Sequence, residues 1–185
     1  MRSPCACVGL ACCALACSGC SIFSYEPTWE LVKAGGATAS YMIAGIPPKA
    51  SDTVRHGLVP HFSRVCIAFN PDVQSMEMVP AIQAALQQRQ IESRVFDSVA
   101  SSLMCPAWLH YAAVIAWDTP PMTSGFRSYV SQAWLTLKTD DGRVLASSSF
   151  ALGGVLEIGK WASTQDKVDA VINALLGVPN AASGV

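Results

Sequence analysis

A tight turn between two apolar segments constrains the fold of this chain more than any other feature. The turn is Thr-Asp-Asp-Gly at 139–142, and its Asp-Gly pair tolerates the positive φ that a short hairpin demands. The flanking segments, 129–138 and 143–150, have the length and composition of strands. We therefore predict an antiparallel hairpin here, and with it a fold that contains a sheet.

A third segment, WLHYAAVIAW at 108–117, is apolar at both alternating positions except for His110. Strands buried on both faces show this composition. The segment therefore predicts a central strand that is covered on both sides, or a sheet that faces a partner.

The segment before it indicates a parallel pair of strands. RVCIAF at 64–69 and ESRVFD at 92–97 are short strand-like runs, and 75–89 carries apolar residues at helical spacing between them. Proline is tolerated in the first turn of a helix, so Pro80 places the start of the regular helix near Val79. A strand, helix and strand in this order favour a parallel pair with a right-handed crossover.

The last helix has clear end signals. Ser163 and Asp166 have the spacing of a capping box, and Gly177 and Pro179 stop the helix. The apolar stripe between these ends consists of Val168, Val171, Ile172, Leu175 and Leu176.

Together these elements predict an α/β fold in which helices pack on a small mixed sheet, in the chain order β-α-β-β-β-β-α. A chain of 185 residues that is 51% hydrophobic and 14% charged has enough apolar side chains for one core. The expected organisation is a signal peptide at 1–19, a lipidated N-terminus and tether at 20–60, a periplasmic domain at 61–178 and a flexible tail at 179–185.

The N-terminus indicates export. Arg2 is followed by an apolar stretch without charge, and the first acidic residue is Glu26. This is the layout of a signal peptide, and it is shorter than the roughly 20 apolar residues of a spanning helix. Five of the eight cysteines precede Cys20. This concentration suggests that the N-terminus carries a membrane anchor as well as an export signal.

The stretch Ala16-Cys17-Ser18-Gly19-Cys20 resembles the box that precedes the lipidated cysteine of bacterial lipoproteins. The resemblance implies cleavage before Cys20, a diacylglycerol on its thiol and a further acyl chain such as palmitate on its amine. Several acyl chains anchor a protein stably. A serine such as Ser21 directly after the lipidated cysteine is typical of lipoproteins that enteric bacteria pass on to the outer membrane. The resemblance therefore implies a protein that is anchored in the outer membrane and faces the periplasm. Three alternatives remain. The lipid acceptor could be Cys13 or Cys17, the segment could be an ordinary cleaved signal peptide, or it could be a hydrophobic helix with incidental cysteines.

Cys66 and Cys105 are the cysteines that remain after the N-terminal cluster. In an oxidising compartment two such cysteines are expected to form a disulfide, which would close a loop of about 40 residues. The alternative is that one of the two thiols is a nucleophile activated by a histidine. The pairs considered are Cys105 with His110, and Cys66 with His56 or His61. We predict no metal site and no cofactor, because no HExxH spacing is present and His56 and His61 are five residues apart, which is not the i, i+4 spacing of one helix face.

The sequence resembles a family of small, uncharacterised proteobacterial lipoproteins over residues 60 to 177. The resemblance rests on the lipobox and on three segments, RVCIAFNPDV, AWLHYAAVIAWD and GKWASTQDKVDAVINALLG. The resemblance implies that Cys66 and Cys105 are the family's paired cysteines, and that Tyr111 with Trp117-Asp118 is its core motif. No activity comes with it. The order of strands is also similar to α/β domains of envelope-assembly proteins, such as the curli secretion lipoprotein and the amino-terminal domain of TolB.

The function expected from these features is that of a non-enzymatic scaffold or adaptor that binds another cell-envelope component. A net charge of −1 without a basic stripe argues against nucleic-acid binding. Two prolines after a strand end should expose a rigid surface, so the candidate partner surface consists of Trp117, Asp118, Pro120, Pro121 and Met122.

Two alternatives stay open. One is a small-ligand-binding lipoprotein, which requires a cavity. The other is a lipid-tethered hydrolase that would use two carboxylates at a defined separation. Asp140 and Asp141 more simply serve the turn, and Asp72 more simply caps a helix. The carboxylates considered for hydrolysis are Asp72, Asp97, Asp118, Asp140 and Asp141.

Overall fold

The computed structural model describes residues 46–97, 105–153 and 157–177. These ranges contain six strands and two helices. The elements are β1 (Asp52–Arg55), β2 (Arg64–Ala68), α2 (Met78–Gln88), β3 (Glu92–Phe96), β4 (Ala107–Asp118), β5 (Arg127–Thr139), β6 (Val144–Ala151) and α3 (Thr164–Leu176).

The strands form one mixed sheet in the order β1-β6-β5-β4-β2-β3. β2 is parallel to both β3 and β4, whereas β4, β5, β6 and β1 pair antiparallel in succession. The predicted α/β class is therefore confirmed, and so are the parallel pair around α2 and the hairpin of β5 and β6.

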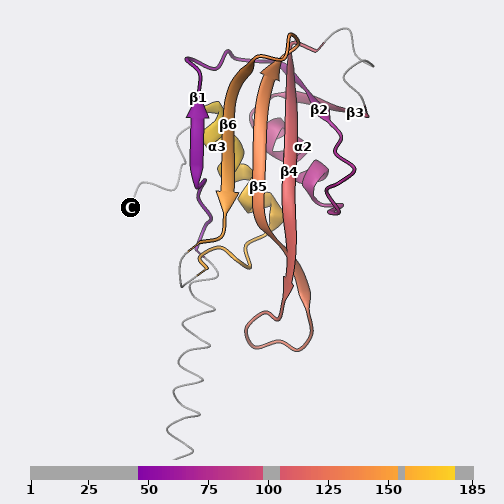
Figure 1. Ribbon diagram of the computed structural model, residues 1–185, viewed down its shortest axis with the longest axis vertical. Helices are drawn as coiled ribbons and strands as arrows, with labels where there is room; N and C mark the ends of the chain where they lie inside the picture. The colour runs from indigo at the N-terminus through magenta and orange to yellow at the C-terminus, as the bar shows by residue number, and fades with distance from the viewer. Residues whose placement is uncertain (1–45, 98–104, 154–156, 178–185) are drawn as a thin grey trace, which may run out of the picture. The chain divides into compact units, whose positions relative to one another are not determined.

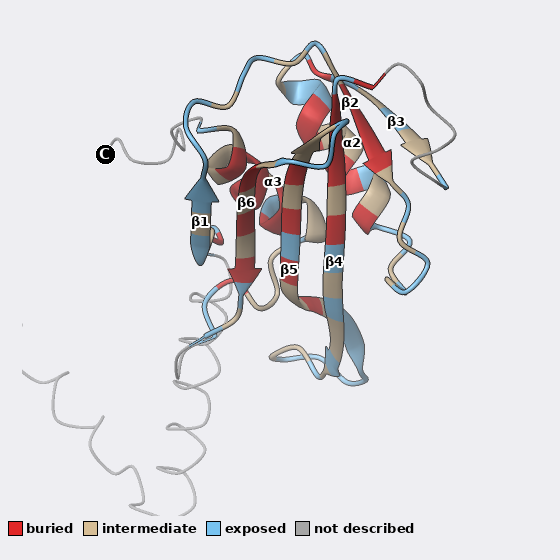
Figure 2. Cartoon of the chain, turned by 45° about the horizontal axis from the view of Figure 1, so that its top comes forward, coloured by how far each residue is buried: buried red, intermediate tan, exposed pale blue. Residues whose placement is uncertain are grey.

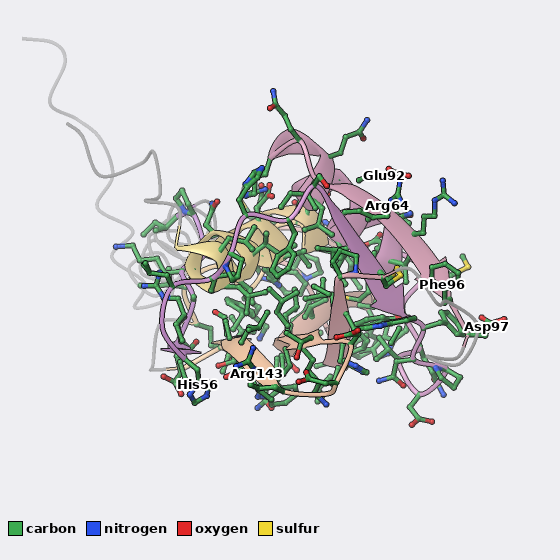
Figure 3. All side chains as sticks on the ribbon, turned by 90° about the horizontal axis from the view of Figure 1, so that it is seen from above. His56, Arg64, Glu92, Phe96, Asp97 and Arg143 are labelled. Atoms are coloured by element: carbon green, nitrogen blue, oxygen red, sulfur yellow. A yellow bond between two sulfur atoms is a disulfide. The ribbon has the colours of Figure 1, made fainter. Side chains whose placement is uncertain are left out.

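Both helices pack on the same face of the sheet, as Figures 1 and 3 show. Side chains that alternate along the strands meet the apolar stripes of the helices there, and Figure 2 shows this buried layer in red. We call the other side of the sheet the open face, because no described helix packs on it. The largest fully buried apolar side chains are Ile67, Met78, Ile82, Leu109, Leu135, Leu137, Ile172 and Leu175.

The helix ends follow from the local sequence. Ser163 accepts a hydrogen bond from the backbone of Asp166, whose side chain accepts one from the backbone N–H of Ser163, so the predicted capping box is present. Gly177 ends α3 at φ 76°, a left-handed conformation that glycine adopts without strain. Pro80 is the third residue of α2, where its missing N–H costs no helical bond.

Two expectations differ from the structure. The sequence predicts a tether over 20–60, yet Asp52–Arg55 forms β1, a sixth strand that pairs with β6. Three of its four side chains are exposed, so the sequence carries no apolar periodicity to reveal it. The other difference concerns the first of the two interpretations of β4, a strand covered on both sides: helices cover only one of its faces, and Ala112, Val114 and Trp117 are exposed. The apolar pattern therefore marks a strand with an uncovered side.

Three predictions lie outside the described residues: the signal peptide at 1–19, the lipid acceptor among Cys13, Cys17 and Cys20, and the tail at 179–185. Within the described ranges, neither helix is both long and apolar enough to cross a membrane.

Candidate functional site

β4 and β5 extend past the rest of the sheet and form a two-stranded arm. β6 pairs with β5 only as far as Gln132, while β5 continues to Arg127 beside Asp118 of β4. We define the arm as residues 115–131. A bulge at its base, where Val114 pairs with Gln132 but Ile115 pairs with Val130, increases the local twist. Figures 1 and 2 show the arm projecting from one end of the sheet, with its tip exposed.

The predicted partner surface lies on this arm. Trp117 is 67% exposed and Met122 is 77% exposed, whereas Asp118, Pro120 and Pro121 are half-buried. The structure therefore brings the predicted residues together on one projection. Phe126, which no sequence pattern selects, is 77% exposed on the same projection.

Lys160 fastens the arm to the segment that precedes α3. Its ammonium group lies 2.7 Å from Asp118 and 2.6 Å from Glu157, and 5.2 Å from the centre of the Tyr129 ring. Burial alone would lower the pKa of Lys160, but its hydrogen bonds to Asp118 and Glu157 outweigh burial and raise that pKa. The hydrogen bond from Lys160 is also the main reason that the pKa of Asp118 is lowered. Asp118 is therefore held ionised as part of a clamp.

A groove lies between the arm and the start of both helices. Thr164, the first residue of α3, donates a hydrogen bond of 2.6 Å to the carboxylate of Glu77, the N-cap residue of α2. Both helices begin beside this hydrogen bond, whereas β4 and β5 continue past it. Part of the arm therefore has no helix over it. Two adjoining hollows of about 290 and 160 Å³ share Tyr129 as a lining residue, and the larger is also lined by Met76, Ile115 and Trp117.

The arm side of β4 also has a free edge. β2 pairs with β4 only at Trp108 and Leu109, and the Asn70 side chain then donates a hydrogen bond of 2.9 Å to the carbonyl of Tyr111. Beyond that point no described strand pairs with this side of β4. Backbone groups alternate between the two edges of a strand, so Ala113, Ile115 and Trp117 direct theirs the same way as Tyr111.

This free edge is unlike the outer edges of the sheet. Edge strands commonly carry charges or are very short, which discourages pairing with other chains. At the β3 edge, Glu92 forms ion pairs with Arg64 and Arg94, and Figure 3 shows Arg64 beside Glu92. The β1 edge is only four residues long. The exposed part of β4 has no charged residue between Tyr111 and Trp117.

Cys66 and Cys105 lie at disulfide distance, with their Cα atoms 5.9 Å apart. They form a small second cluster with Trp108 on the open face, and the ring of Phe96 packs edge-on against Trp108. The bridge therefore ties β2 to the residues that lead into β4. A cysteine within this pair would have no thiol to act as the nucleophile of the alternative interpretation.

The structure separates Asp118 from Asp140 and Asp141 among the candidate hydrolase carboxylates. Asp118 lies at one end of the β4 and β5 pair, and Asp140 and Asp141 lie in the turn at the other end. Asp97 follows β3 and is labelled at the sheet edge in Figure 3. Asp72 does not cap α2 as expected, because α2 begins at Met78 and Glu77 occupies the cap position.

Within the described ranges, no three His, Cys, Asp or Glu side chains are grouped to hold a metal ion. Burial, with a smaller effect of Lys138, lowers the pKa of His110.

Sequence reasoning missed Met76, Phe126, Lys160 and Lys167. Met76 and Phe126 stand alone among polar or turn residues, so no periodic pattern selects them. Lys167 is 1% exposed, and its ammonium donates hydrogen bonds to the carbonyls of Val130 and Lys160. A single lysine beside the apolar stripe of α3 is typical of a surface residue, and only packing shows that it is buried.

No protein-family model matches this sequence, and no curated protein matches it either. Among solved structures, the chain is similar to the PelC dodecamer from Paraburkholderia phytofirmans, with 14% identity and a TM-score of 0.45. A single-residue variant of PelC from the same organism gives a TM-score of 0.46 at the same identity. Both alignments cover 67% of this chain and 96% of the PelC chain. These values support no inference about what this chain binds or how it assembles.

Proposed function

We propose that this protein is a lipid-anchored, non-enzymatic adaptor of the outer membrane, facing the periplasm. Its docking site for another envelope protein is the free edge of β4 between Ala112 and Asp118. The lipobox at Cys20 and the cysteine pair at Cys66 and Cys105 support the compartment. The observation that carries the docking role is an unprotected β edge beside an open groove.

An added strand would satisfy the backbone of this edge. Extended segments bind in this way to exposed sheet edges, where main-chain hydrogen bonds give affinity and side-chain pockets give specificity. The partner strand would occupy the position that β2 leaves after Ala68, continuing the sheet beside Ala113, Ile115 and Trp117.

The groove specifies the side chains of that strand. Side chains of an added strand alternate between the two faces of the sheet. Those on the helix side would enter the hollow of about 290 Å³ that Met76, Ile115 and Trp117 line, which suits an apolar side chain. Those on the open face would lie beside Ala112 and Val114, both exposed. The preferred partner segment is therefore extended and apolar at alternate positions.

The proposal is tested by photo-crosslinking in cells. A photo-reactive phenylalanine derivative at Val114, which is 47% exposed next to the edge, should yield a discrete crosslink to one envelope protein. The same group at Asp140, in the turn at the opposite end of β5, serves as the position control.

Two substitutions of Ala113 make the test specific for strand addition. Ala113→Pro removes the N–H directed at the partner and is tolerated at an edge, so it should abolish the Val114 crosslink. Ala113→Val keeps that N–H and favours a strand, so the crosslink should persist. Equal crosslinking by both variants, with unfolding midpoints near that of the wild type, would rule out docking along β4.

A further inference from the structure

The tip of the arm exposes apolar side chains in a loop that carries no charge. Met122 and Phe126 are each 77% exposed, and the loop that holds them, 119–126, contains no charged residue. Arg127 follows the loop. Exposed apolar side chains that are grouped on a projecting element are typical of sites that contact a protein or a membrane.

The chain enters the sheet at the end from which the arm projects. The backbone N–H of Ser51 donates a hydrogen bond of 2.7 Å to Ser149, and the Ser51 hydroxyl donates one of 3.1 Å to Ala151, the last residue of β6. Ala151 pairs with Gln132, where the arm begins. β4 continues for four residues beyond this level, from Ile115 to Asp118, which is roughly 13 Å of strand.

From these positions we propose that the tip of the arm, Met122 and Phe126, contacts the surface of the lipid bilayer that holds the N-terminal anchor. The inference rests on the anchoring part of the proposed function. Residues 21–45 link Cys20 to the described domain, and about 25 residues reach at most roughly 90 Å. An anchor at Cys20 would therefore keep the domain within that distance of the membrane. A contact at the entry end would orient the domain with the turn at 139–142 directed away.

Backbone hydrogen bonding limits how deep the tip can lie. The arm is a two-stranded ribbon, and in the described residues its β4 edge has no partner strand. Unpaired backbone groups are too costly in the hydrocarbon core, so the arm itself must remain in the interfacial layer. Phe126 and Met122 reach the boundary of the acyl chains from there, and Arg127 stays among the headgroups.

The tip is held in shape before it meets the bilayer. Thr123 donates hydrogen bonds to the carbonyl of Pro120 from both its backbone N–H and its hydroxyl, and Pro120 and Pro121 restrict the backbone. Lys160 fixes the strand end at Asp118. An ordered tip loses little conformational freedom on contact, which favours binding by few side chains.

The test places a fluorescent probe at the tip of the full-length lipidated protein. Ser124→Cys adds a thiol between Met122 and Phe126 at an exposed position, while Cys66 and Cys105 are paired. Asp140→Cys gives a matched probe at the opposite end of β5. The labelled proteins are incorporated into vesicles of phosphatidylethanolamine and phosphatidylglycerol whose acyl chains carry bromine, and flotation measures attachment separately from quenching.

The expected result is flotation of both proteins, with quenching several-fold stronger for the tip probe than for the Asp140 probe. Adding Met122→Ser and Phe126→Ser should remove the difference without reducing flotation. Flotation without preferential quenching of the tip probe overturns the bilayer contact and leaves the anchor intact. Crosslinking of the tip to an envelope protein in cells also overturns the bilayer contact. A lipid-free protein that does not float overturns the anchor and the inference together.

Discussion

The ammonium group of Lys160 lies 2.7 Å from the carboxylate of Asp118, which joins the segment before α3 to the last residue of β4. Glu157 receives a second ion pair from the same lysine at 2.6 Å. Lys160 is the less exposed partner, with 12% of its side chain accessible against 50% for Asp118. The clamp therefore holds the outer end of β4 against the segment that precedes α3.

Lys160→Met should loosen the arm without unfolding the domain. Methionine keeps much of the length of the side chain but removes the charge that Asp118 and Glu157 bind and that lies over the rings of Tyr129 and Trp161. Hydrogen exchange of the arm amides at 127–131 should become several-fold faster, while exchange in α3 should not change. Lys138→Met, which removes a lysine outside the arm, is the control, and equal exchange in both variants would show that the clamp does not hold the arm.

Loss of the bridge between Cys66 and Cys105 should reduce stability substantially. A pair 39 residues apart closes a loop worth about 4 kcal/mol in the chain-entropy model. Replacing both cysteines by alanine should lower the free energy of unfolding in urea by that order, and reduction of the wild type should have a similar effect. A thiol assay on the unfolded, unreduced protein should detect neither residue, and detection of both would refute the pairing.

Ser163→Ala should destabilise the start of α3. The serine hydroxyl accepts a hydrogen bond of 3.1 Å from the backbone of Asp166, which satisfies one of the free N–H groups of the first turn. We expect a loss of about 1 kcal/mol in urea unfolding. Ser124→Ala, in the arm loop, is the matched control and should change stability very little. A loss as large for Ser124→Ala would indicate that the effect does not come from capping.

Lys167 should make stability rise with pH in the alkaline range. Burial, with the nearby charge of Arg127, lowers its pKa in the folded protein from 10.5 to about 8, although Asp166 acts in the opposite direction. Between these values the unfolded chain binds more protons than the folded one, so the free energy of unfolding increases as the pH rises. The total gain is roughly 3 kcal/mol, from about 1.4 kcal/mol per pKa unit.

Lys167→Met isolates this contribution. The variant cannot titrate at this position, so the difference in unfolding free energy between wild type and variant should grow in favour of the wild type from pH 8 to 10.5. Urea titrations at several pH values measure the difference. A constant difference across the range would mean that Lys167 keeps an ordinary pKa in the folded protein.

Local sequence determined the elements whose signals are short in range. The Asp-Gly turn, the capping box at Ser163 and Asp166, and the stripe of α3 each involve neighbours within a few residues, and the structure has all three. The parallel pair of β2 and β3 followed from a connection rule that depends only on the order of elements. Trp117 and Met122 of the predicted surface are exposed for the same local reason, since a strand ends at two prolines.

Tertiary structure alone decided which part of β4 has neighbours. The run from Trp108 to Trp117 is apolar at both alternating positions, and that pattern cannot distinguish a strand covered on both faces from one with an uncovered face and edge. The outcome depends on where β2 ends and where α2 and α3 begin, which are separate in sequence. β1 and the buried position of Lys167 were not predicted for the same reason. β1 pairs with β6, and Lys167 donates a hydrogen bond to the carbonyl of Val130. These are long-range contacts, and they produce no periodic pattern in the segments that contain β1 and Lys167.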